Sequence, residues 1–329
     1  MKILMTSVRD DEEAAIAAYT ARTGVEIITS AAPLEDNLDQ LAAVDGVIMQ
    51  QRNRLADAIY AQLAEAGLKQ ISTRTAGYDV INVPLAHEHG LRVTNVPAYS
   101  PRSVAEHALM QILRLLRKSY EVDRRVANND YRWGGLQAKE IHSATIGIIG
   151  VGRIGGALAK LLAALGATVL GYDVNPRDDL AGIVTYTTKA DLLQRADVVS
   201  LHVDLNETSV GLIGAAEFAL MQPTAGLVNA SRGPVIDTAA LITALETGEL
   251  AGVALDTVSG EETIFNVDHQ EDGLTSQPNI EKLHAMSNVM LTPHIAFFTN
   301  IAVQNMVDIA LDDVQLILNG ETSPHEIER

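Results

Sequence analysis

Three side chains far apart in the sequence have the types needed for acid–base chemistry on a small carboxylate. Arg232 follows an apolar run, and its guanidinium could bind a carboxylate through two parallel hydrogen bonds. His294 follows a second apolar run, and Glu261 lies in a polar stretch. A carboxylate beside an imidazole stabilises the protonated ring and fixes its orientation, as a general acid–base requires. Taken singly, the three are more simply a surface arginine, a capped or buried histidine and a solvated acid, and their spacing does not show that they meet.

A strand–turn–helix–strand unit is predicted over residues 145–173, and its turn reads Gly-Val-Gly-Arg-Ile-Gly. In such a unit Gly150 permits the tight turn, Gly152 lets backbone N–H groups approach a pyrophosphate, and Gly155 lets helix and strand pack closely. The exposed amides and partial positive charge of the helix start also favour phosphates. The pattern predicts a dinucleotide site, with a glycine-rich turn of some other α/β protein as the alternative.

Asp173 follows the second strand of this unit and selects among dinucleotides. Its carboxylate can accept hydrogen bonds from an adenosine ribose and would repel the additional phosphate of NADP. The next residues offer no immediate cation, although Arg177 is near. We therefore predict NAD as the cofactor.

Composition excludes several classes of function for this chain of 329 residues. The net charge of −18 argues against nucleic acid or an anionic membrane as a partner. There is no cysteine, so disulfides and thiolate metal ligands are excluded, and we predict no metal site. We expect no secretory signal and no membrane span, because no apolar run reaches about 18 residues. These features fit a cytoplasmic protein.

Strands alternate with helices along the whole chain, which predicts an α/β fold with two doubly wound parallel sheets. The first hundred residues contain enough elements for a domain of their own. A single helix is predicted from about Arg102 to Asn128, long enough to bridge domains or subunits. Helices are also expected over 189–195 and 238–247, a strand over 226–229, and a final amphipathic helix over 300–319.

Several predicted strands end on polar or charged residues, which lie at the edge where open α/β sheets bind ligands. These residues are Asp173, His202, Arg232, Asp256 and His294.

Taken together, these motifs resemble those of the D-isomer-specific 2-hydroxyacid dehydrogenase family. The matching stretches are residues 150–155, 196–203, 229–233 with the continuation to Asp256, and 292–294. The similarity also includes residues 95–101 and covers nearly the whole chain. Within the family, the chain looks most like the D-lactate and D-2-hydroxyisocaproate dehydrogenases.

The resemblance implies an NAD-dependent reduction of 2-keto acids to D-2-hydroxy acids. Arg232 would bind the substrate's carboxylate and keto oxygen, His294 would give a proton to the carbonyl, and Glu261 would hold His294 protonated. Substrate would also contact the backbone N–H groups of Ala76 and Gly77, the side chain of Tyr99, and Met49. The residues implied to bind the cofactor, beyond the three glycines, are Arg153, Ile154, Asp173, His202, Val203, Ala230, Ser231 and Asp256.

The family's architecture implies a discontinuous catalytic domain, flavodoxin-like, of residues 1–99 and 295–329. A Rossmann NAD-binding domain of residues 100–294 would be inserted into it. The long helix after Pro101 would build the interface of a homodimer, and closure of the domains would expel water from the substrate.

Two positions depart from the family's pattern. Asp204 replaces the proline that commonly follows His-Val, and Met49 stands where lactate-preferring relatives tend to carry an aromatic residue. Methionine is adaptable, so branched or aromatic acids such as 2-ketoisocaproate and phenylpyruvate are expected to fit better than pyruvate, unless Met49 is ordinary packing. A D-lactate dehydrogenase with pyruvate as main substrate is the alternative.

Two alternative functions are compatible with the same fold. The first is an enzyme with another substrate, since relatives act on formate, phosphoglycerate or glyoxylate. The second is a scaffold that senses NAD(H), as relatives of corepressor type do. The Arg–Glu–His set disfavours both. The physiological substrate, the direction of flux and the size of the oligomer are left open by the sequence.

Overall fold

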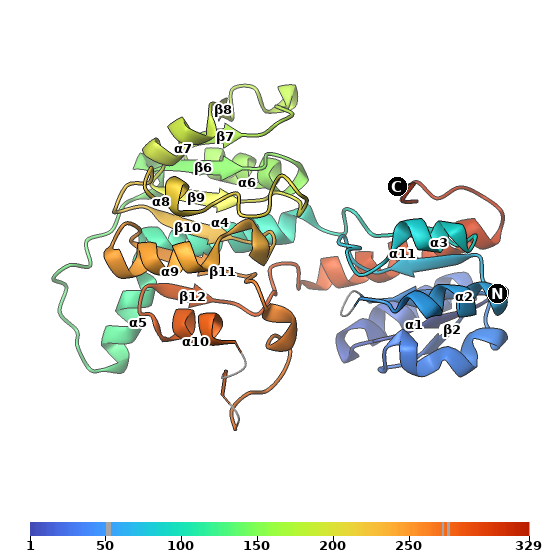
Figure 1. Ribbon diagram of the computed structural model, residues 1–329. Helices are drawn as coiled ribbons and strands as arrows, with labels where there is room; N and C mark the ends of the chain where they lie inside the picture. The colour runs from blue at the N-terminus through green and yellow to red at the C-terminus, as the bar shows by residue number, and fades with distance from the viewer. Residues whose placement is uncertain (51–53, 272, 275–276, 329) are drawn as a thin grey trace. The chain divides into compact units, whose positions relative to one another are not determined.

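The computed structural model describes residues 1–50, 54–271, 273–274 and 277–328. The chain divides into two compact units, which we call unit 1 (Met1–Ser100 with Phe298–Arg329) and unit 2 (Pro101–Phe297). Figure 1 labels many of the elements of both units. Each unit is built on one parallel sheet, so the predicted α/β class with two doubly wound sheets is confirmed.

Unit 1 contains a five-stranded parallel sheet with the order β2-β1-β3-β4-β5, the flavodoxin-like order. Its strands are β1 (Lys2–Met5), β2 (Glu26–Thr29), β3 (Gly46–Met49), β4 (Gln70–Thr73) and β5 (Arg92–Thr94). Its helices are α1 (Glu13–Thr23), α2 (Asp57–Glu65), α3 (Val83–Glu88) and α11 (Asn300–Leu318), with short 3₁₀ helices at Asp10–Glu12 and Leu34–Ala43. The 3₁₀ helix at Leu34–Ala43 was not predicted.

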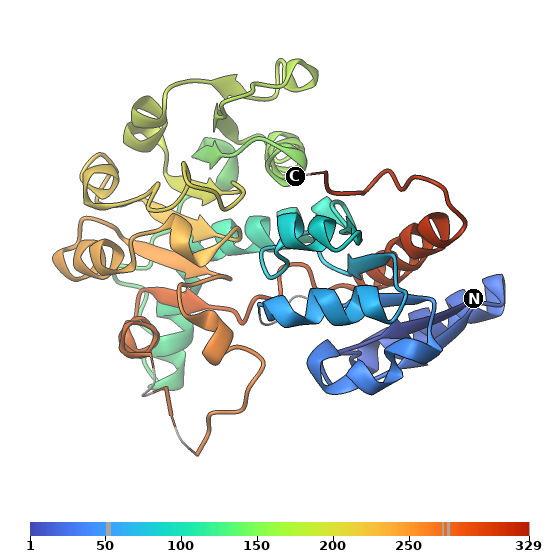
Figure 2. The ribbon, with the colours of Figure 1, turned by 45° about the vertical axis from the view of Figure 1, so that its right-hand side comes forward.

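Both faces of this sheet are buried, because successive strand side chains point to opposite sides. In β1, Ile3 and Met5 belong to a hydrophobic cluster with α1 and α11, whereas Leu4 belongs to a second cluster with α2 and α3. The last helix of the chain therefore completes the core of the unit that begins it. Figure 2 shows α11, in red, close to the blue strands.

Unit 2 contains a seven-stranded parallel sheet with the order β12-β11-β10-β9-β6-β7-β8. The first six strands in chain order follow the doubly wound dinucleotide-binding arrangement, and β12 extends it. The strands are β6 (Thr145–Ile149), β7 (Thr168–Tyr172), β8 (Thr185–Tyr186), β9 (Val198–Leu201), β10 (Gly226–Asn229), β11 (Gly252–Leu255) and β12 (Val289–Leu291). The helices are α4 (Pro101–Leu116), α5 (Ser119–Ala127), α6 (Arg153–Ala164), α7 (Lys189–Arg195), α8 (Ala215–Phe218), α9 (Thr238–Thr247) and α10 (Pro278–Ala285).

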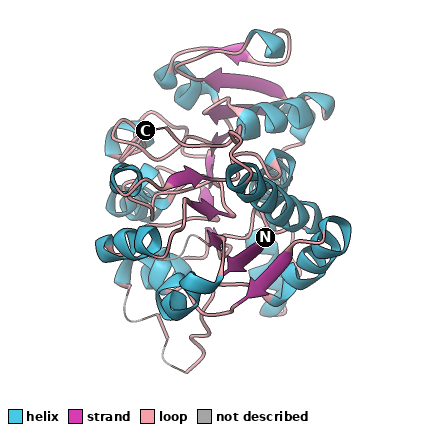
Figure 3. Cartoon of the chain, turned by 90° about the vertical axis from the view of Figure 1, so that its right-hand side faces the viewer, coloured by secondary structure: helices cyan, strands magenta, loops and turns pink. Residues whose placement is uncertain are grey.

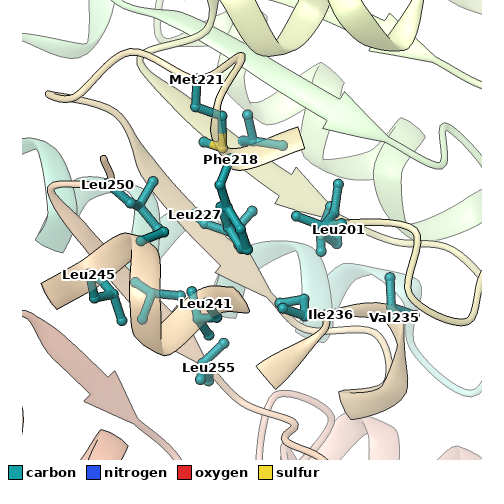
Figure 4. Packing of buried hydrophobic residues seen from close by; sticks show 14 of the residues in the cluster. Leu201, Phe218, Met221, Leu227, Val235, Ile236, Leu241, Leu245, Leu250 and Leu255 are labelled. Carbon is teal, nitrogen blue, oxygen red and sulfur yellow. The ribbon is translucent and has the colours of Figure 1, made fainter. Parts of the chain in front are cut away.

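The larger sheet is also buried on both faces. Val198 and Val228 point into a cluster with α4 and α6, and their neighbours Val199 and Leu227 point into a cluster with α7, α8 and α9. Figure 3 shows the strands with helices on either side, and Figure 4 shows Leu227 within the second cluster. Continuous apolar runs of four or five residues are therefore strands here, as the sequence predicted.

The prediction of one helix from about residue 102 to 128 is wrong. The helix breaks between α4 and α5 at Lys118, whose φ of +53° lies in the left-handed region that a continuous helix cannot contain. α4 buries one face in unit 2, whereas no residue of α5 is buried, so the two segments have different environments. The helix α10, which begins at Pro278, was not predicted.

Candidate functional site

The carboxyl ends of six strands in unit 2 form one edge of the sheet. In the parallel register Ile149 pairs with Tyr172 and Leu201, and Leu201 pairs with Asn229. Asn229 pairs in turn with Leu255, which pairs with Leu291. The residues that follow these strand ends therefore emerge side by side, and they include the glycine-rich turn, Asp173, His202, Arg232, Asp256 and His294.

His294 and Glu261 meet at this edge. His294 Nδ1 lies 2.6 Å from Glu261 Oε1, and the other carboxylate oxygen accepts a hydrogen bond of 2.6 Å from the backbone N–H of Val258. The carboxylate is thus fixed at both oxygens and fixes the ring in turn. The imidazole is 39% exposed, and its Nε2 has no hydrogen-bond partner among the described residues. One ring nitrogen is therefore oriented by the protein, while the other can exchange a proton with a ligand.

The turn that carries His294 is strained and is held by Asp256. His294 has a φ of +54°, a conformation that is rare for residues other than glycine. The buried carboxylate of Asp256 accepts hydrogen bonds from the Thr292 hydroxyl (2.6 Å) and from the N–H groups of Ile295 (3.0 Å) and Ala296 (2.9 Å). These bonds bracket His294 on both sides. Asp256 therefore positions His294, and its contact with the cofactor stays a prediction.

Arg232 lies in a turn that is ordered by a buried amide. Asn229 accepts from the N–H and hydroxyl of Ser231 and donates to the carbonyl of Arg232. Among the described residues, the Arg232 guanidinium has one hydrogen bond, to the carbonyl of Ser231 (2.8 Å), and no carboxylate pairs with it. A partly buried guanidinium without a carboxylate partner is suited to bind an anionic ligand.

Gly233 joins the Arg232 turn to the Glu261 turn. A Cβ atom at Gly233 would lie 2.2 Å from the carbonyl carbon of Val258, so only glycine permits this backbone approach. Val258 is the residue whose N–H holds Glu261. The structure thus ties the loops that carry Arg232 and Glu261 together, although no hydrogen bond joins Arg232 to His294 among the described residues.

The glycine-rich turn has the shape that a dinucleotide requires. Gly150 has a φ of +89°, and a Cβ at Gly155 would lie 2.1 Å from the carbonyl oxygen of Gly150. By contrast, a Cβ at Gly152 would have no heavy atom within 4 Å. Two glycines therefore permit close packing of the protein itself, and Gly152 leaves open space for a ligand at the start of α6.

Two polar groups flank this turn. The carboxylate of Asp173 accepts hydrogen bonds from the N–H groups of Val151 (2.6 Å) and Asn175 (2.8 Å), which fix it beside the turn. The Nδ1 atom of His202 is buried without a partner among the described residues, while its Nε2 lies 2.8 Å from the Ser200 hydroxyl. Burial lowers the pKa of His202 to about 4, so the ring is neutral at pH 7. A buried polar atom without a partner fits a site that a ligand completes.

The remaining residues predicted to bind the cofactor lie at the same edge. Arg153 and Ile154 begin α6, Val203 follows His202, and Ala230 and Ser231 follow β10. The residues present therefore fit a dinucleotide.

The substrate-binding residues predicted from the family lie in unit 1. The carbonyls of Ala76 and Gly77 are held by Asn95 Nδ2 (2.6 Å) and the Thr75 hydroxyl (2.8 Å), which orients this loop. Tyr99 is partly buried and packs against the cluster that contains α11. Their contact with substrate stays a prediction.

Met49 lies in the hydrophobic core of unit 1. Its side chain is 4% exposed and belongs to the cluster that contains Leu4 and Val47. This burial favours the alternative that Met49 is ordinary packing.

Sequence reasoning missed three positioning residues. Thr292 and Asn229 belong to the family's motifs, but sequence reasoning assigned them no role. In the structure their side chains form hydrogen bonds with site residues. The third is His107 on α4, whose Nε2 lies 3.2 Å from Thr292 Oγ1 and 3.6 Å from Asp256 Oδ1. Burial lowers the pKa of His107. The available signal for Thr292 and Asn229 was a hydroxyl or amide beside a predicted strand end, a signal that His107, on a helix, does not have.

The part of the chain that the structure describes has neither a cluster of metal ligands nor a helix that could span a membrane. No group of three or more histidine, aspartate or glutamate side chains there could hold a metal ion. None of the described helices has the length and apolar character needed to cross a membrane.

Comparison with known proteins finds relatives of the chain among proteins named as dehydrogenases. Residues 109–296 match a family model described as the NAD-binding domain of D-isomer specific 2-hydroxyacid dehydrogenases. A D-2-hydroxyacid dehydrogenase (NAD⁺) of Clostridioides difficile is 39% identical over 99% of the chain and 100% of its own length. The structure of a D-lactate dehydrogenase from Sporolactobacillus sp is 51% identical, with a TM-score of 0.89 over 100% of this chain and 99% of that one. The structure of a D-2-hydroxyisocaproate dehydrogenase is 33% identical, with a TM-score of 0.92 over the whole of both chains.

Proposed function

The chain belongs to the D-isomer specific 2-hydroxyacid dehydrogenases, a family of NAD-dependent oxidoreductases, and we propose that it reduces 2-keto acids to D-2-hydroxy acids. The observation that carries the proposal is the hydrogen bond of 2.6 Å between His294 and Glu261 on an edge that also presents Arg232. A histidine with one oriented and one available ring nitrogen supports an enzyme of this class over an NAD(H)-sensing scaffold.

His294 is the proposed general acid. Glu261 holds Nδ1, so the proton passes from Nε2 to the substrate's carbonyl oxygen as the carbonyl is reduced, and returns to Nε2 in the oxidative direction. When bound, NADH supplies the hydride. Arg232 is proposed to bind the carboxylate and polarise the keto oxygen, because its guanidinium has donors left for both. The N–H groups of Ala76 and Gly77, with Tyr99, are proposed to contact the substrate as well.

Two substrate classes have separate support. Pyruvate is supported by the 51% identity to a protein named a D-lactate dehydrogenase. Larger acids, such as 2-ketoisocaproate and phenylpyruvate, are supported by the likeness to a D-2-hydroxyisocaproate dehydrogenase. The sequence-based argument for larger acids from Met49 is weakened, because its side chain is in the core of unit 1.

Initial rates of NADH oxidation with pyruvate, 2-ketoisocaproate and phenylpyruvate test the proposal. We expect turnover with at least one of them and a loss of roughly 1,000-fold or more in kcat for His294→Ala, since general acid–base catalysis contributes about 10²–10⁴-fold. His284→Ala, a change at an exposed histidine of α10, serves as the matched control. Highest kcat/KM with pyruvate would identify a D-lactate dehydrogenase. NADH binding without turnover of any 2-keto acid would contradict the proposed reaction.

We also propose that the protein is a homodimer. In unit 2, Trp133 is 88% exposed and Tyr131 is 70% exposed, beside the helix α5 that buries none of its residues. Large aromatic side chains at this exposure are typical of surfaces that a second copy covers. Sedimentation velocity should give twice the chain mass, and Trp133→Ser with Tyr131→Ser should shift the protein toward the monomer. A fully active monomer at all concentrations would contradict the dimer.

A further inference from the structure

A guanidinium is tied to two groups beside the glycine-rich turn. Arg177 follows β7, and its Nε and Nη2 donate to the two carboxylate oxygens of Asp179 at 2.9 and 2.7 Å. Its Nη1 donates to the carbonyl oxygen of Gly152 at 2.7 Å. The result is a bidentate ion pair whose cation touches the turn where the dinucleotide is expected.

The guanidinium lies against the first turn of α6. A Cβ atom at Gly156 would be 2.7 Å from Arg177 Nη1, so this glycine leaves the space that the guanidinium occupies. Asp173 binds Val151, the residue before Gly152, because its Oδ2 accepts a hydrogen bond from the N–H of Val151. The carboxylate of Asp173 and the guanidinium of Arg177 thus bind consecutive residues of one turn. The hydrogen-bonded pair with Asp179 raises the pKa of Arg177, and the negative charge of Asp173 adds to this effect.

This juxtaposition has a consequence for the choice of dinucleotide. The acid after the second strand binds the ribose hydroxyls of NAD, whereas an arginine near it accommodates the 2′-phosphate of NADP. The chain has both, but Asp179 engages the arginine in an ion pair. The side chain of Arg177 remains 35% exposed, so its guanidinium is accessible to a phosphate once the pair opens.

We propose that Arg177 is a latent site for the 2′-phosphate of NADP and that Asp179, by holding Arg177, is a second determinant of NAD selectivity beside Asp173. This inference rests on the dinucleotide site of the proposed function and is independent of which 2-keto acid is the substrate. Removing the negative charge of Asp173 alone leaves the cation paired. Removing both carboxylates releases it.

A purely structural role for the pair is the competing explanation. The backbone N–H of Arg177 donates to the Tyr186 hydroxyl at 3.0 Å, and Lys160 lies 3.9 Å from Asp179, so the loop has other supports. A loop brace would affect NADH and NADPH alike. A latent phosphate site affects NADPH alone.

Binding of NADH and NADPH to the full chain without substrate, measured by titration calorimetry, separates these explanations. Asp173→Asn/Asp179→Asn should bind NADPH roughly tenfold more tightly than Asp173→Asn, as expected for one charge-assisted contact. The single change Asp179→Asn should leave the Kd for NADH within about twofold, because Asp179 does not take part in holding NAD. Adding Arg177→Gln to the double variant should abolish the gain for NADPH.

Asp178→Asn is the matched control, because it removes the same charge from the adjacent residue. Among the described residues, no hydrogen bond or ion pair joins Asp178 to Arg177. An equal gain for NADPH from Asp173→Asn/Asp178→Asn, or a gain that persists with Arg177→Gln, would overturn the proposal in favour of net charge. Equal loss of NADH and NADPH binding on Asp179→Asn would overturn it in favour of a loop brace. Failure of the unaltered protein to bind NADH would instead overturn the dinucleotide site itself.

Discussion

One carboxylate in each unit is paired with a basic side chain, and the two pairs differ in burial. In unit 1, Glu12 and Arg74 are both 0% exposed, and Arg74 Nε lies 2.8 Å from Glu12 Oε1. The guanidinium also donates to the carbonyls of Thr6 and Ser7, both at 2.9 Å. In unit 2, Glu261 and His294 are 18% and 39% exposed, and only one ring nitrogen is engaged. One pair is enclosed by the protein, and the other is open on one side.

This difference in burial separates a structural pair from a chemical one. Two charges without access to water must each be matched by hydrogen bonds, and losing one partner leaves the other charge buried. The Glu12–Arg74 pair meets this condition and ties the 3₁₀ helix Asp10–Glu12 to the residue after β4, close to Ala76 and Gly77. A pair that is open to ligand can instead exchange a proton. We therefore expect similar chemical groups to give rigidity in one unit and the proposed proton transfer in the other.

The largest effect is expected from Glu12→Ala, which leaves the Arg74 guanidinium buried without its carboxylate. We expect a loss of about 3–5 kcal/mol in the free energy of unfolding. Hydrogen exchange of the amides of β1 and β4 would locate the loss in unit 1. Glu13→Ala, at the exposed neighbour in α1, is the control and should stay within about 0.5 kcal/mol of the unaltered protein. Equal stability of the two variants would contradict a structural role for the Glu12–Arg74 pair.

A smaller effect, on catalysis and not on folding, is expected from Glu261→Gln. The amide keeps the shape of the side chain but removes the carboxylate charge beside Nδ1 of His294, the proposed general acid, so kcat/KM should fall by about 100-fold. The Kd for NADH and the midpoint of urea unfolding should change little. Glu262→Gln, at the adjacent exposed acid, should have full activity. If Glu261→Gln instead lowered stability and spared the rate, the pair would be structural like that of unit 1.

The smallest effect sharpens the comparison with a third case, a buried ionisable group without a charge partner. The pKa of His202 falls from the ordinary 6.5 to about 4 because of burial. Between these values the unfolded chain binds a proton that the folded chain does not, so stability is full above about pH 6.5 and declines as the pH falls. The contribution at pH 5 is roughly 2 kcal/mol.

Urea unfolding at pH 7 and pH 5 tests this sign. His202→Gln should lose less stability between the two pH values than the unaltered protein, because glutamine does not titrate. His284→Gln, at an exposed histidine, should behave like the unaltered protein. An identical pH dependence for His202→Gln would show that the ring is not held neutral by the fold.

Local patterns in the sequence were sufficient for most of the fold. The predicted helices Lys189–Arg195 and Thr238–Thr247 and the strand Gly226–Asn229 have the same bounds in the structure. Their signals lie within a few residues: an apolar run, a capping Thr188 or Asp237, or the stop at Gly248. The family resemblance and NAD as cofactor are confirmed, because they depend on motifs that are contiguous in the chain.

The sequence by itself determined most of the elements, the dinucleotide turn and the set of polar residues at the strand ends, because hydrophobic period and turn chemistry are local. Only the tertiary structure decided which of these residues meet. Glu261 and His294 are 33 positions apart, and their contact depends on the order and register of β10, β11 and β12. The same holds for the carboxylate of Asp256, which holds the turn of His294, and for Met49, which packs in a core. Such contacts follow from how strands are arranged side by side, and no residue's immediate neighbours in the chain contain that information.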